Sequence, residues 1–223
     1  MKLSNDTLTI LKNFSSINTG IEFKSGNVLS TISPGKTILA KATLKDTFPE
    51  DFCVYDLNQF LSVHSLNKDT EIDFDDMNVI FKSGKSKIKY RKTAKEMIIT
   101  PPDKDLSLPS VDASFVLSDD TFSSIMKSAS ILQSPHIAVE SVGGKLYISC
   151  FDAKDDSAHT NSIEIGDSET DDFKLVFFTE NLKMIPGSYD VEISSRGLAS
   201  FKHKTQEIDY WIAIEAKESK FGV

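Results

Sequence analysis

The stretch Leu3–Ile17, LSNDTLTILKNFSSI, returns in modified form as LSDDTFSSIMKSASI at Leu117–Ile131. At an offset of 114 residues, the two stretches agree at six of fifteen positions. Both begin with a leucine and a serine, continue with an acidic residue and a threonine, and end with a serine and an isoleucine. The recurrence raises the question of whether the whole chain is doubled.

Both stretches are predicted to be amphipathic helices that begin at a polar cap. In the first, Ser4 or Asn5 is the candidate cap, and in the second it is Ser118 or Asp119. The apolar residues follow at helical spacing, so each helix should rest one face on a sheet. The residues expected on those faces are Leu8, Leu11, Phe14 and Ile17 in the first copy, and Phe122, Ile125, Met126 and Ala129 in the second.

The elements predicted after the first helix recur in the same order after the second helix. Residues 20–33 and 136–150 each contain two alternating apolar runs around a glycine turn, which predicts a hairpin in both copies. Further strands are predicted at Thr37–Leu44 and His159–Ile165. Second helices are predicted at 55–66, capped by Asp56, and at 178–187, capped by Thr179.

A second similarity supports duplication along the whole chain. FKSGKSKIKY at 81–90 shares phenylalanine, lysine, isoleucine and tyrosine with FKHKTQEIDY at 201–210. Between the copies, 100–114 carries three prolines and is predicted to be a surface connector. The prediction is an α+β chain of two similar domains in tandem, 1–108 and 109–223, each an antiparallel sheet plus two helices.

Composition limits the classes of function. The chain has 223 residues, 26% of them charged, and a formal charge of −8, which argues against coating nucleic acid by blanket phosphate neutralisation. Residues 1–110 hold 15 basic and 14 acidic residues, net +1, whereas residues 111–223 hold 10 and 19, net −9. Without an export signal or an apolar run of spanning length, we expect a protein that is not secreted and has no membrane partner, with Cys53 and Cys150 reduced.

Motifs of catalysis and metal binding are missing from the sequence. The segments SPGKT (33–37) and SGKS (83–86) lack the earlier glycine of a phosphate-binding loop, and DFDDMN (73–78) and DAKDD (152–156) lack calcium-loop spacing. The four histidines form no HExxH pair, and neither cysteine lies in a CxxC. The sequence therefore predicts no enzyme, no metal and no cofactor.

Clusters of opposite charge suggest that copies of the chain associate with one another. Seven basic and no acidic residues lie within 82–95, and eight acidic residues with one lysine lie within 152–172. Exposed strand edges can pair head to tail, and such contacts close into a ring when the rotation allows. A solvated strand face is the equally open alternative. The residues predicted at the subunit interface are Lys85, Lys87, Lys89 and Arg91 on one side, and Asp155, Asp156 and Glu164 on the other.

Several segments resemble the DNA polymerase sliding clamp of T4-type bacteriophages. They are MKLSNDT, LKNFSSINTGIEFKSG, YDLNQFL, MIPGSYDVEI and YWIAIEA, and the resemblance covers most of the chain, fading in 34–50 and 91–114. It implies the DNA clamp fold, a homotrimeric ring, and helices that line a hole around duplex DNA. It also implies a DNA polymerase and a clamp loader as partners, in the cytoplasm of an infected bacterial host. The main alternative is a non-catalytic phage structural or assembly protein, and a second is a hydrolase without recognisable motifs.

The resemblance assigns two further sets of residues. Cations on or near the predicted helices would face the DNA, the alternative being ordinary solvated helix residues: Lys2, Lys12, His64, Lys68, Lys127 and Lys183. Apolar residues of the connector and of the carboxyl-terminal region would form a pocket for a partner peptide, although core packing is the commoner fate of Trp211 and Ile212: Ile98, Ile99, Leu106, Leu108, Trp211, Ile212 and Phe221.

Overall fold

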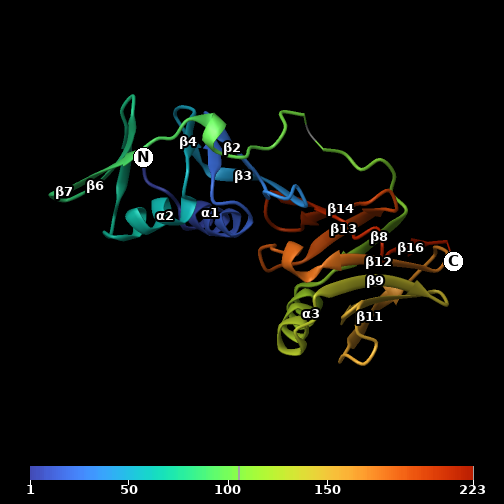
Figure 1. Cartoon of the computed structure of the whole chain (residues 1–223). Coiled ribbons are helices and arrows are strands. Elements are labelled where there is room, and N and C mark those ends of the chain that lie inside the picture. The colour runs from blue at the N-terminus through green and yellow to red at the C-terminus, as the bar shows by residue number, and fades with distance from the viewer. Residues whose placement is uncertain (105, 223) are drawn as a thin grey trace. The chain divides into compact units, whose positions relative to one another are not determined.

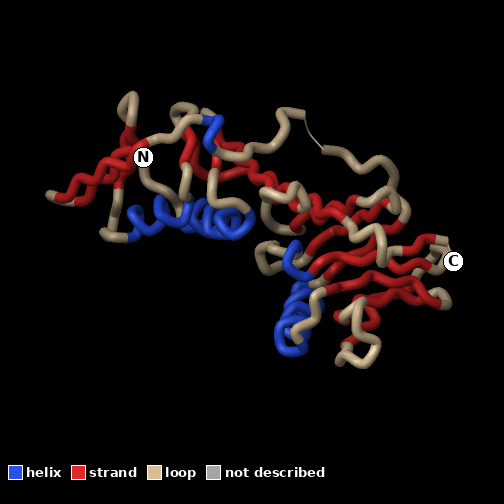
Figure 2. Tube along the Cα trace, in the orientation of Figure 1, coloured by secondary structure: helices blue, strands red, loops and turns tan. Residues whose placement is uncertain are grey.

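The computed structural model describes residues 1–104 and 106–222, and the chain divides into two compact units, Met1–Lys104 and Asp105–Val223 (Figure 1). Asp105, within the predicted connector, and Val223, the last residue of the predicted second domain, lie outside the described residues. Figure 2 shows both units as mixtures of helix and strand. The predicted α+β class is confirmed.

The first unit carries two α-helices and three small antiparallel sheets. Strand β1 pairs with β4, β2 pairs with β3, and β5, β6 and β7 form a three-stranded sheet in that order. Helices α1 and α2 lie side by side, and α1 packs against β2 and β3. The elements are α1 (Asn5–Ile17), β1 (Ile21–Phe23), β2 (Gly26–Ile32), β3 (Ile38–Phe48), β4 (Phe52–Val54), α2 (Leu57–Ser65), β5 (Glu71–Phe74), β6 (Asn78–Ser83), β7 (Ser86–Arg91) and the 3-10 helix η1 (Lys95–Met97).

The second unit carries one α-helix and two antiparallel sheets. One sheet contains β11, β10, β9, β12 and β16 in that order, and β8, β13, β14 and β15 pair in sequence in the other. Helix α3 packs on β10 and β11. The elements are β8 (Ala113–Leu117), α3 (Asp119–Leu132), β9 (His136–Val142), β10 (Lys145–Phe151), β11 (Asn161–Asp167), β12 (Phe173–Phe178), the 3-10 helix η2 (Thr179–Asn181), β13 (Tyr189–Ser194), β14 (Leu198–His203), β15 (Ile208–Ala213) and β16 (Lys220–Phe221).

The duplicated helix start is confirmed at the level of its cap. Ser4 is the N-cap of α1, and its side chain accepts a hydrogen bond from the Thr7 amide at 3.3 Å. Ser118 caps α3 and accepts from the Thr121 amide at 3.2 Å. The two caps are 114 residues apart, so the repeated sequence encodes the same local structure twice.

Two local predictions are wrong. Residues 20–33 do not form a hairpin, because Ile21–Phe23 pairs with β4 while the following strand pairs with β3. The helix predicted at 178–187 is only the short η2, which ends at Asn181 because the Leu182 backbone leaves the helical region, and the Thr179 hydroxyl donates to the Ser134 carbonyl instead of capping. The hairpin at 136–150 and the helix capped by Asp56 are confirmed.

Aromatic side chains fill the core of each unit. In the first, the Phe23 ring stacks on Phe52 at 4.5 Å between centroids, and Phe60 of α2 contacts Phe81 of β6. In the second, Tyr189 packs edge to face against Phe122 and Phe201, among others. Among the described residues no helix is long and apolar enough to cross a membrane.

Candidate functional site

The outward faces of the two equivalent helices each present one lysine. Lys12 of α1 and Lys127 of α3 are exposed. They differ by one position when counted from their caps, which corresponds to a rotation of about 100° around a helix. The buried faces differ in the same way: α1 buries Thr7, Ile10, Leu11, Phe14 and Ile17, and α3 buries Phe122, Ile125 and Ala129.

Because the centre of the buried face also shifts by about 100°, each lysine lies opposite its own helix's packed face. The apparent misregister in the sequence is therefore compensated in the fold. The predicted apolar faces are correct except at one residue in each helix. In α1, Leu8 is only partly buried and Ile10 is buried instead, and in α3, Met126 is only partly buried.

Three further predicted DNA-facing lysines lie outside the helices. Lys2 precedes α1, and its ammonium lies 4.0 Å from a carboxylate oxygen of Asp69. Lys68 lies in the turn after α2, and Lys183 follows η2. All three lysines are exposed, so each can reach a ligand.

The structure does not support His64 as a cation. Its ring is partly buried at the end of α2, with Phe81 at 6.2 Å between ring centroids. The ring Nε2 is buried without a hydrogen-bond partner, and burial lowers the pKa of His64 below its usual value. A neutral imidazole adds nothing to phosphate attraction, so burial weakens the case for His64 as a DNA-facing cation.

The basic strand predicted in the first unit is β7. Its residues alternate, with Lys87, Lys89 and Arg91 exposed and Ile88 and Tyr90 turned toward the unit. Lys85 lies in the turn before the strand. Among the described residues of this unit β7 pairs only with β6, so its outer edge is open.

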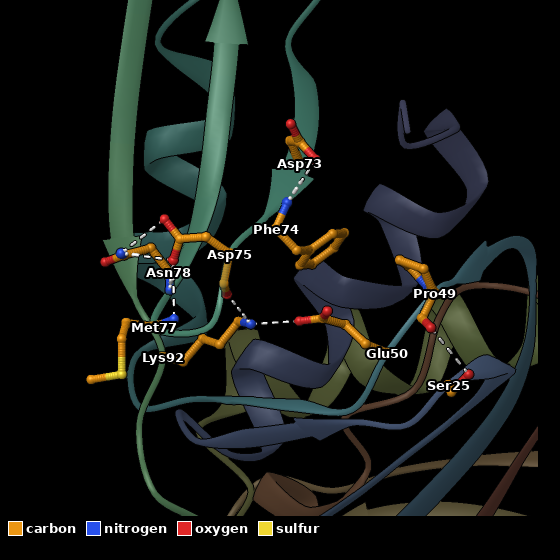
Figure 3. Close-up of polar contacts among 9 residues, drawn as sticks. All are labelled: Ser25, Pro49, Glu50, Asp73, Phe74, Asp75, Met77, Asn78 and Lys92. Carbon is orange, nitrogen blue, oxygen red and sulfur yellow. Dashed lines mark hydrogen bonds and ion pairs between the residues drawn. The ribbon is translucent and has the colours of Figure 1, made fainter.

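A partly buried lysine anchors the sheet that carries β7 (Figure 3). The Lys92 ammonium donates to a Glu50 carboxylate oxygen at 2.5 Å and to the Asp75 carbonyl at 2.6 Å. Its side chain is only 14% exposed. The Asp75 carboxylate orders the same turn by accepting from the Met77 and Asn78 amides. Lys92 thus joins the turn after β3 to the turn after β5 and fixes the end of β7.

The acidic counterpart lies in the second unit. Glu164 is exposed on β11, which pairs only with β10 among the described residues of this unit and is an outer strand. Its carboxylate lies 3.2 Å from the Lys145 ammonium. Asp155 and Asp156 are exposed in the turn before β11. Hydrogen bonds from Ser157 to the Asp155 carboxylate lower the pKa of Asp155, which therefore stays ionised.

The predicted peptide-pocket residues fall into two groups. Ile212 is fully buried and is unavailable to a partner, and Ile98, which lies against Gly20, is partly buried. The other residues are partly or largely exposed: Ile99 in the first unit, and Leu106, Leu108, Trp211 and Phe221 in the second.

Sequence reasoning missed a surface hollow beside β7. It lies in the first unit, and Tyr55, Met77 and Ile88 are among its lining residues together with the basic residues Lys89 and Arg91. Tyr55 and Met77 are largely exposed. The signal in the sequence was a large side chain in each of two turns, Tyr55 before Asp56 and Met77 after Asp75 and Asp76. The described residues contain no group of side chains suited to a metal ion.

Comparison with known proteins shows which family the chain belongs to. Residues 4–100 match the family model described as DNA polymerase processivity factor, and residues 115–216 match the model for the carboxyl-terminal part of the gp45 sliding clamp. The chain is 32% identical over 223 residues to the sliding clamp of Enterobacteria phage T4, covering 97% of each chain. The chain belongs to the family of T4-type sliding clamps.

Other relatives agree with this assignment. The sliding clamp of Vibrio phage KVP40 is 31% identical over 222 residues, covering 97% of this clamp and all of the relative. The clamp is thus a DNA polymerase processivity factor and not an enzyme. This excludes both the structural-protein alternative and the hydrolase.

Solved structures share the fold at low sequence identity. The Thermococcus kodakaraensis PCNA structure superimposes with a TM-score of 0.66 at 14% identity, covering 94% of this clamp and 96% of that chain. A Helicobacter pylori beta clamp bound to a DNA ligase peptide gives 0.69 at 12% identity, covering 96% of this clamp and 64% of that chain. The DNA clamp fold is confirmed.

Proposed function

We propose that the clamp assembles as a closed homotrimeric ring around duplex DNA and holds a DNA polymerase there. Topology keeps a closed ring on DNA, so only weak contacts to phosphate are needed, and tight contacts would prevent sliding. A tethered polymerase rebinds at a high effective concentration instead of diffusing away. This mechanism suits a chain of net charge −8, which is poorly suited to binding phosphate over its whole surface.

The DNA-facing contacts in this proposal come from the helices. Lys12 and Lys127 each lie opposite the packed face of their helix, and Lys2, Lys68 and Lys183 lie near helix ends. Each offers one flexible ammonium, which attracts phosphate without reading the base sequence. His64 is left out of this set because its ring is partly buried and neutral.

The observation that carries the ring proposal is the opposite charge of two open strand edges. The edge of β7 presents Lys87, Lys89 and Arg91, with Lys85 in the adjoining turn. The edge of β11 presents Glu164, with Asp155 and Asp156 in the turn before it. Pairing β7 of one subunit with β11 of the next satisfies both backbone edges and both charges. Because the two edges differ, the contact is head to tail and repeats around a ring.

Partner recruitment is the second part of the proposal. The polymerase, and the loader that opens the ring, would each bind the clamp through a short peptide. The solved beta clamp with a DNA ligase peptide and an A. fulgidus PCNA with a region of FEN-1 are examples of such complexes in structures with this fold. The candidate contacts in the second unit are Leu106, Leu108 and Trp211, with Ile99 in the first. The setting would be the cytoplasm of the infected host.

A charge-reversal experiment tests the ring. The variant Lys87→Glu/Lys89→Glu/Arg91→Glu should reduce the mass measured in solution from that of a trimer to that of a single subunit at moderate salt. Combining these changes with Asp155→Lys/Asp156→Lys/Glu164→Lys in one chain should restore the trimer, since every contact in the ring is then again complementary. Lys24, Lys41 and Lys202 lie outside β7, and the variant that replaces all three by glutamate is the control, which should stay assembled.

The ring proposal fails if the β7 variant remains a trimer. DNA retention then tests encirclement separately. The assembled clamp loaded on circular DNA should survive salt that removes ordinary phosphate binders, and should leave when the circle is cut. Equal loss from circular and linear DNA would contradict encirclement even if the trimer stands.

A further inference from the structure

The outer edge of β12 is occupied by a very short strand of the clamp itself. Strand β16 consists of Lys220 and Phe221, and it pairs antiparallel with Phe173 and Lys174 at the start of β12. Before this strand, the Glu215 amide donates to the Val176 carbonyl at 2.8 Å, and the Ser219 hydroxyl accepts from the Val176 amide at 2.9 Å. A strand of two residues is far shorter than the usual strand of about five residues, so little backbone pairing holds it in place.

One side chain of β16 fits its place and the other does not. The Phe221 ring stacks on Phe173 with 5.6 Å between centroids and 15° between planes. Lys220 lies directly opposite Lys174. Like charges directly opposite each other destabilise a strand pair. In β16, Phe221 therefore makes a favourable aromatic contact with Phe173, whereas Lys220 places an unfavourable charge opposite Lys174.

Lys174 belongs to a row of charges across the sheet. On its other side it pairs with Glu140 of β9, and the Lys174 ammonium lies 2.7 Å from the Glu140 carboxylate. A third strand with a carboxylate opposite Lys174 would give the row the order negative, positive, negative. Lys220 instead gives negative, positive, positive.

The aromatic residue of β16 could also be replaced by one from another segment. Phe173 is 3% exposed, whereas Phe221 remains 41% exposed after stacking on it. Phe173 is thus a fixed part of the core, and Phe221 is a loosely packed cover over it. Any extended segment that brings an aromatic ring to this position can make the same stack.

We propose that the outer edge of β12 is a strand-addition site for a partner peptide, and that Lys220–Phe221 is its displaceable occupant. The peptide is extended and antiparallel to β12, with an acidic residue opposite Lys174 followed by an aromatic residue opposite Phe173. Strand addition supplies the main-chain hydrogen bonds, and these two side chains supply specificity. The inference rests on the proposed function in that the peptide would belong to a protein recruited by the ring.

A set of short peptides provides the test. The probe is acetyl-Thr-Val-Asp-Phe-Thr-amide, and its matched controls replace Asp by Lys or Phe by Ala. Binding is measured by titration of backbone amide signals in NMR spectra of the whole clamp. The Asp-Phe probe should shift amides of 173–176 and 219–222, and each control should bind at least about threefold more weakly, because it lacks one cross-strand charge pair or ring pair.

Two variants of the clamp should move the affinity in opposite directions. Phe221→Ala weakens the resident strand and should strengthen probe binding by about fivefold, the value of one aromatic pair. Lys220→Glu places a carboxylate opposite Lys174, tightens the resident strand and should weaken probe binding by about two- to fivefold. Lys202→Glu on β14 has the same charge change and is the control for general repulsion of an acidic probe, and it should leave binding nearly unchanged.

The inference is wrong if Phe221→Ala leaves probe binding unchanged or weakens it, if Lys202→Glu matches Lys220→Glu, or if the shifted amides lie away from β12. None of these measurements uses DNA, a polymerase or ring assembly. Failure of the ring experiment would leave the peptide result interpretable, and failure here would leave the ring standing.

Discussion

The hairpin β6–β7 of the first unit and the hairpin β14–β15 of the second derive from the same repeated sequence, yet they differ on their outward side. Their inward residues correspond at an offset of 120: Phe81 with Phe201, Ile88 with Ile208, and Tyr90 with Tyr210. Phe81, Phe201, Ile208 and Tyr210 are buried and Ile88 and Tyr90 are partly buried. The inward pattern has thus been kept in both copies.

Two outward residues differ in the sign of their charge. Where the first hairpin carries Lys87 and Lys89, the second carries Glu207 and Asp209. Packing constrains an inward side chain by volume, whereas an exposed charge can be exchanged at little cost in stability. The inward face is therefore the part that the two copies share, whereas the outward face differs in charge at these two positions.

One further corresponding position, two residues after the inward tyrosine, shows the contrast most sharply. Lys92 in the first unit corresponds to Ile212 in the second, which is fully buried. Unit one fills the position with an ion pair to Glu50 and unit two with an apolar side chain. An ion pair and an apolar side chain can serve equally well at one position when each has suitable neighbours.

Lys92→Ile should therefore be the most damaging exchange between the units. It leaves Glu50 and the Asp75 carbonyl without their donor, and we expect a loss of about 1–3 kcal/mol in the free energy of unfolding. Glu50 is 42% exposed, so water limits the loss. Denaturant unfolding followed by circular dichroism measures it.

The control for that exchange is Lys82→Ile on β6. Lys82 also pairs with a carboxylate, that of Asp73, but both side chains are about half exposed, and the change should cost less than about 1 kcal/mol. The double variant Lys92→Ile/Glu50→Leu should recover part of the loss. Equal losses for Lys92→Ile and Lys82→Ile would show that the Lys92 pair is an ordinary surface contact.

The two helix caps should differ by a smaller amount. Ser4→Ala removes the bond to the Thr7 amide and also a 2.8 Å hydrogen bond from the Ser4 hydroxyl to Asp46, whereas Ser118→Ala removes only contacts with Thr121. We expect a loss of about 1–2 kcal/mol at Ser4 and about 1 kcal/mol at Ser118. Thermal unfolding of the two variants and of Ser15→Ala, a partly buried serine within α1, provides the comparison. A larger loss at Ser118 would contradict the role of Asp46.

Asp46 also gives the first cap a dependence on pH. Burial raises the pKa of Asp46, but hydrogen bonds from Ser4 and Thr7 outweigh burial, and the pKa lies below its usual 3.8. A lowered pKa in the folded state means that Asp46 stabilises the clamp above pH 3.8, and that this contribution disappears as the pH falls through the lowered value. Part of the acid destabilisation, measured by denaturant unfolding at a series of pH values, should be absent from Asp46→Asn.

The sequence predicted what local pattern controls and missed what distant partners decide. Neighbouring residues in the sequence determine the caps at Ser4 and Ser118 and the alternation of exposed basic and inward residues in β7. The pairing of Ile21–Phe23 with β4 joins segments about thirty residues apart, and alternation alone cannot select that partner over the nearer strand. The surroundings of the His64 ring include Phe81 of β6, a contact that helical position alone does not reveal.

The smallest expected effect is on the salt dependence of DNA binding, where Lys12 and Lys127 should differ from His64. If Lys12 and Lys127 are equivalent, Lys12→Gln and Lys127→Gln should each make DNA binding less dependent on salt, lowering the slope of log K against log salt by about 0.9 for each phosphate that is no longer neutralised. His64→Gln should leave the slope unchanged at neutral pH, because burial lowers the pKa of His64 and the ring carries no charge there. Titration of labelled duplex at several salt concentrations measures all three slopes. A reduced slope for only one lysine would mean that opposing the packed face does not place both helices alike toward DNA, and a reduced slope for His64→Gln would return that residue to the set of cations.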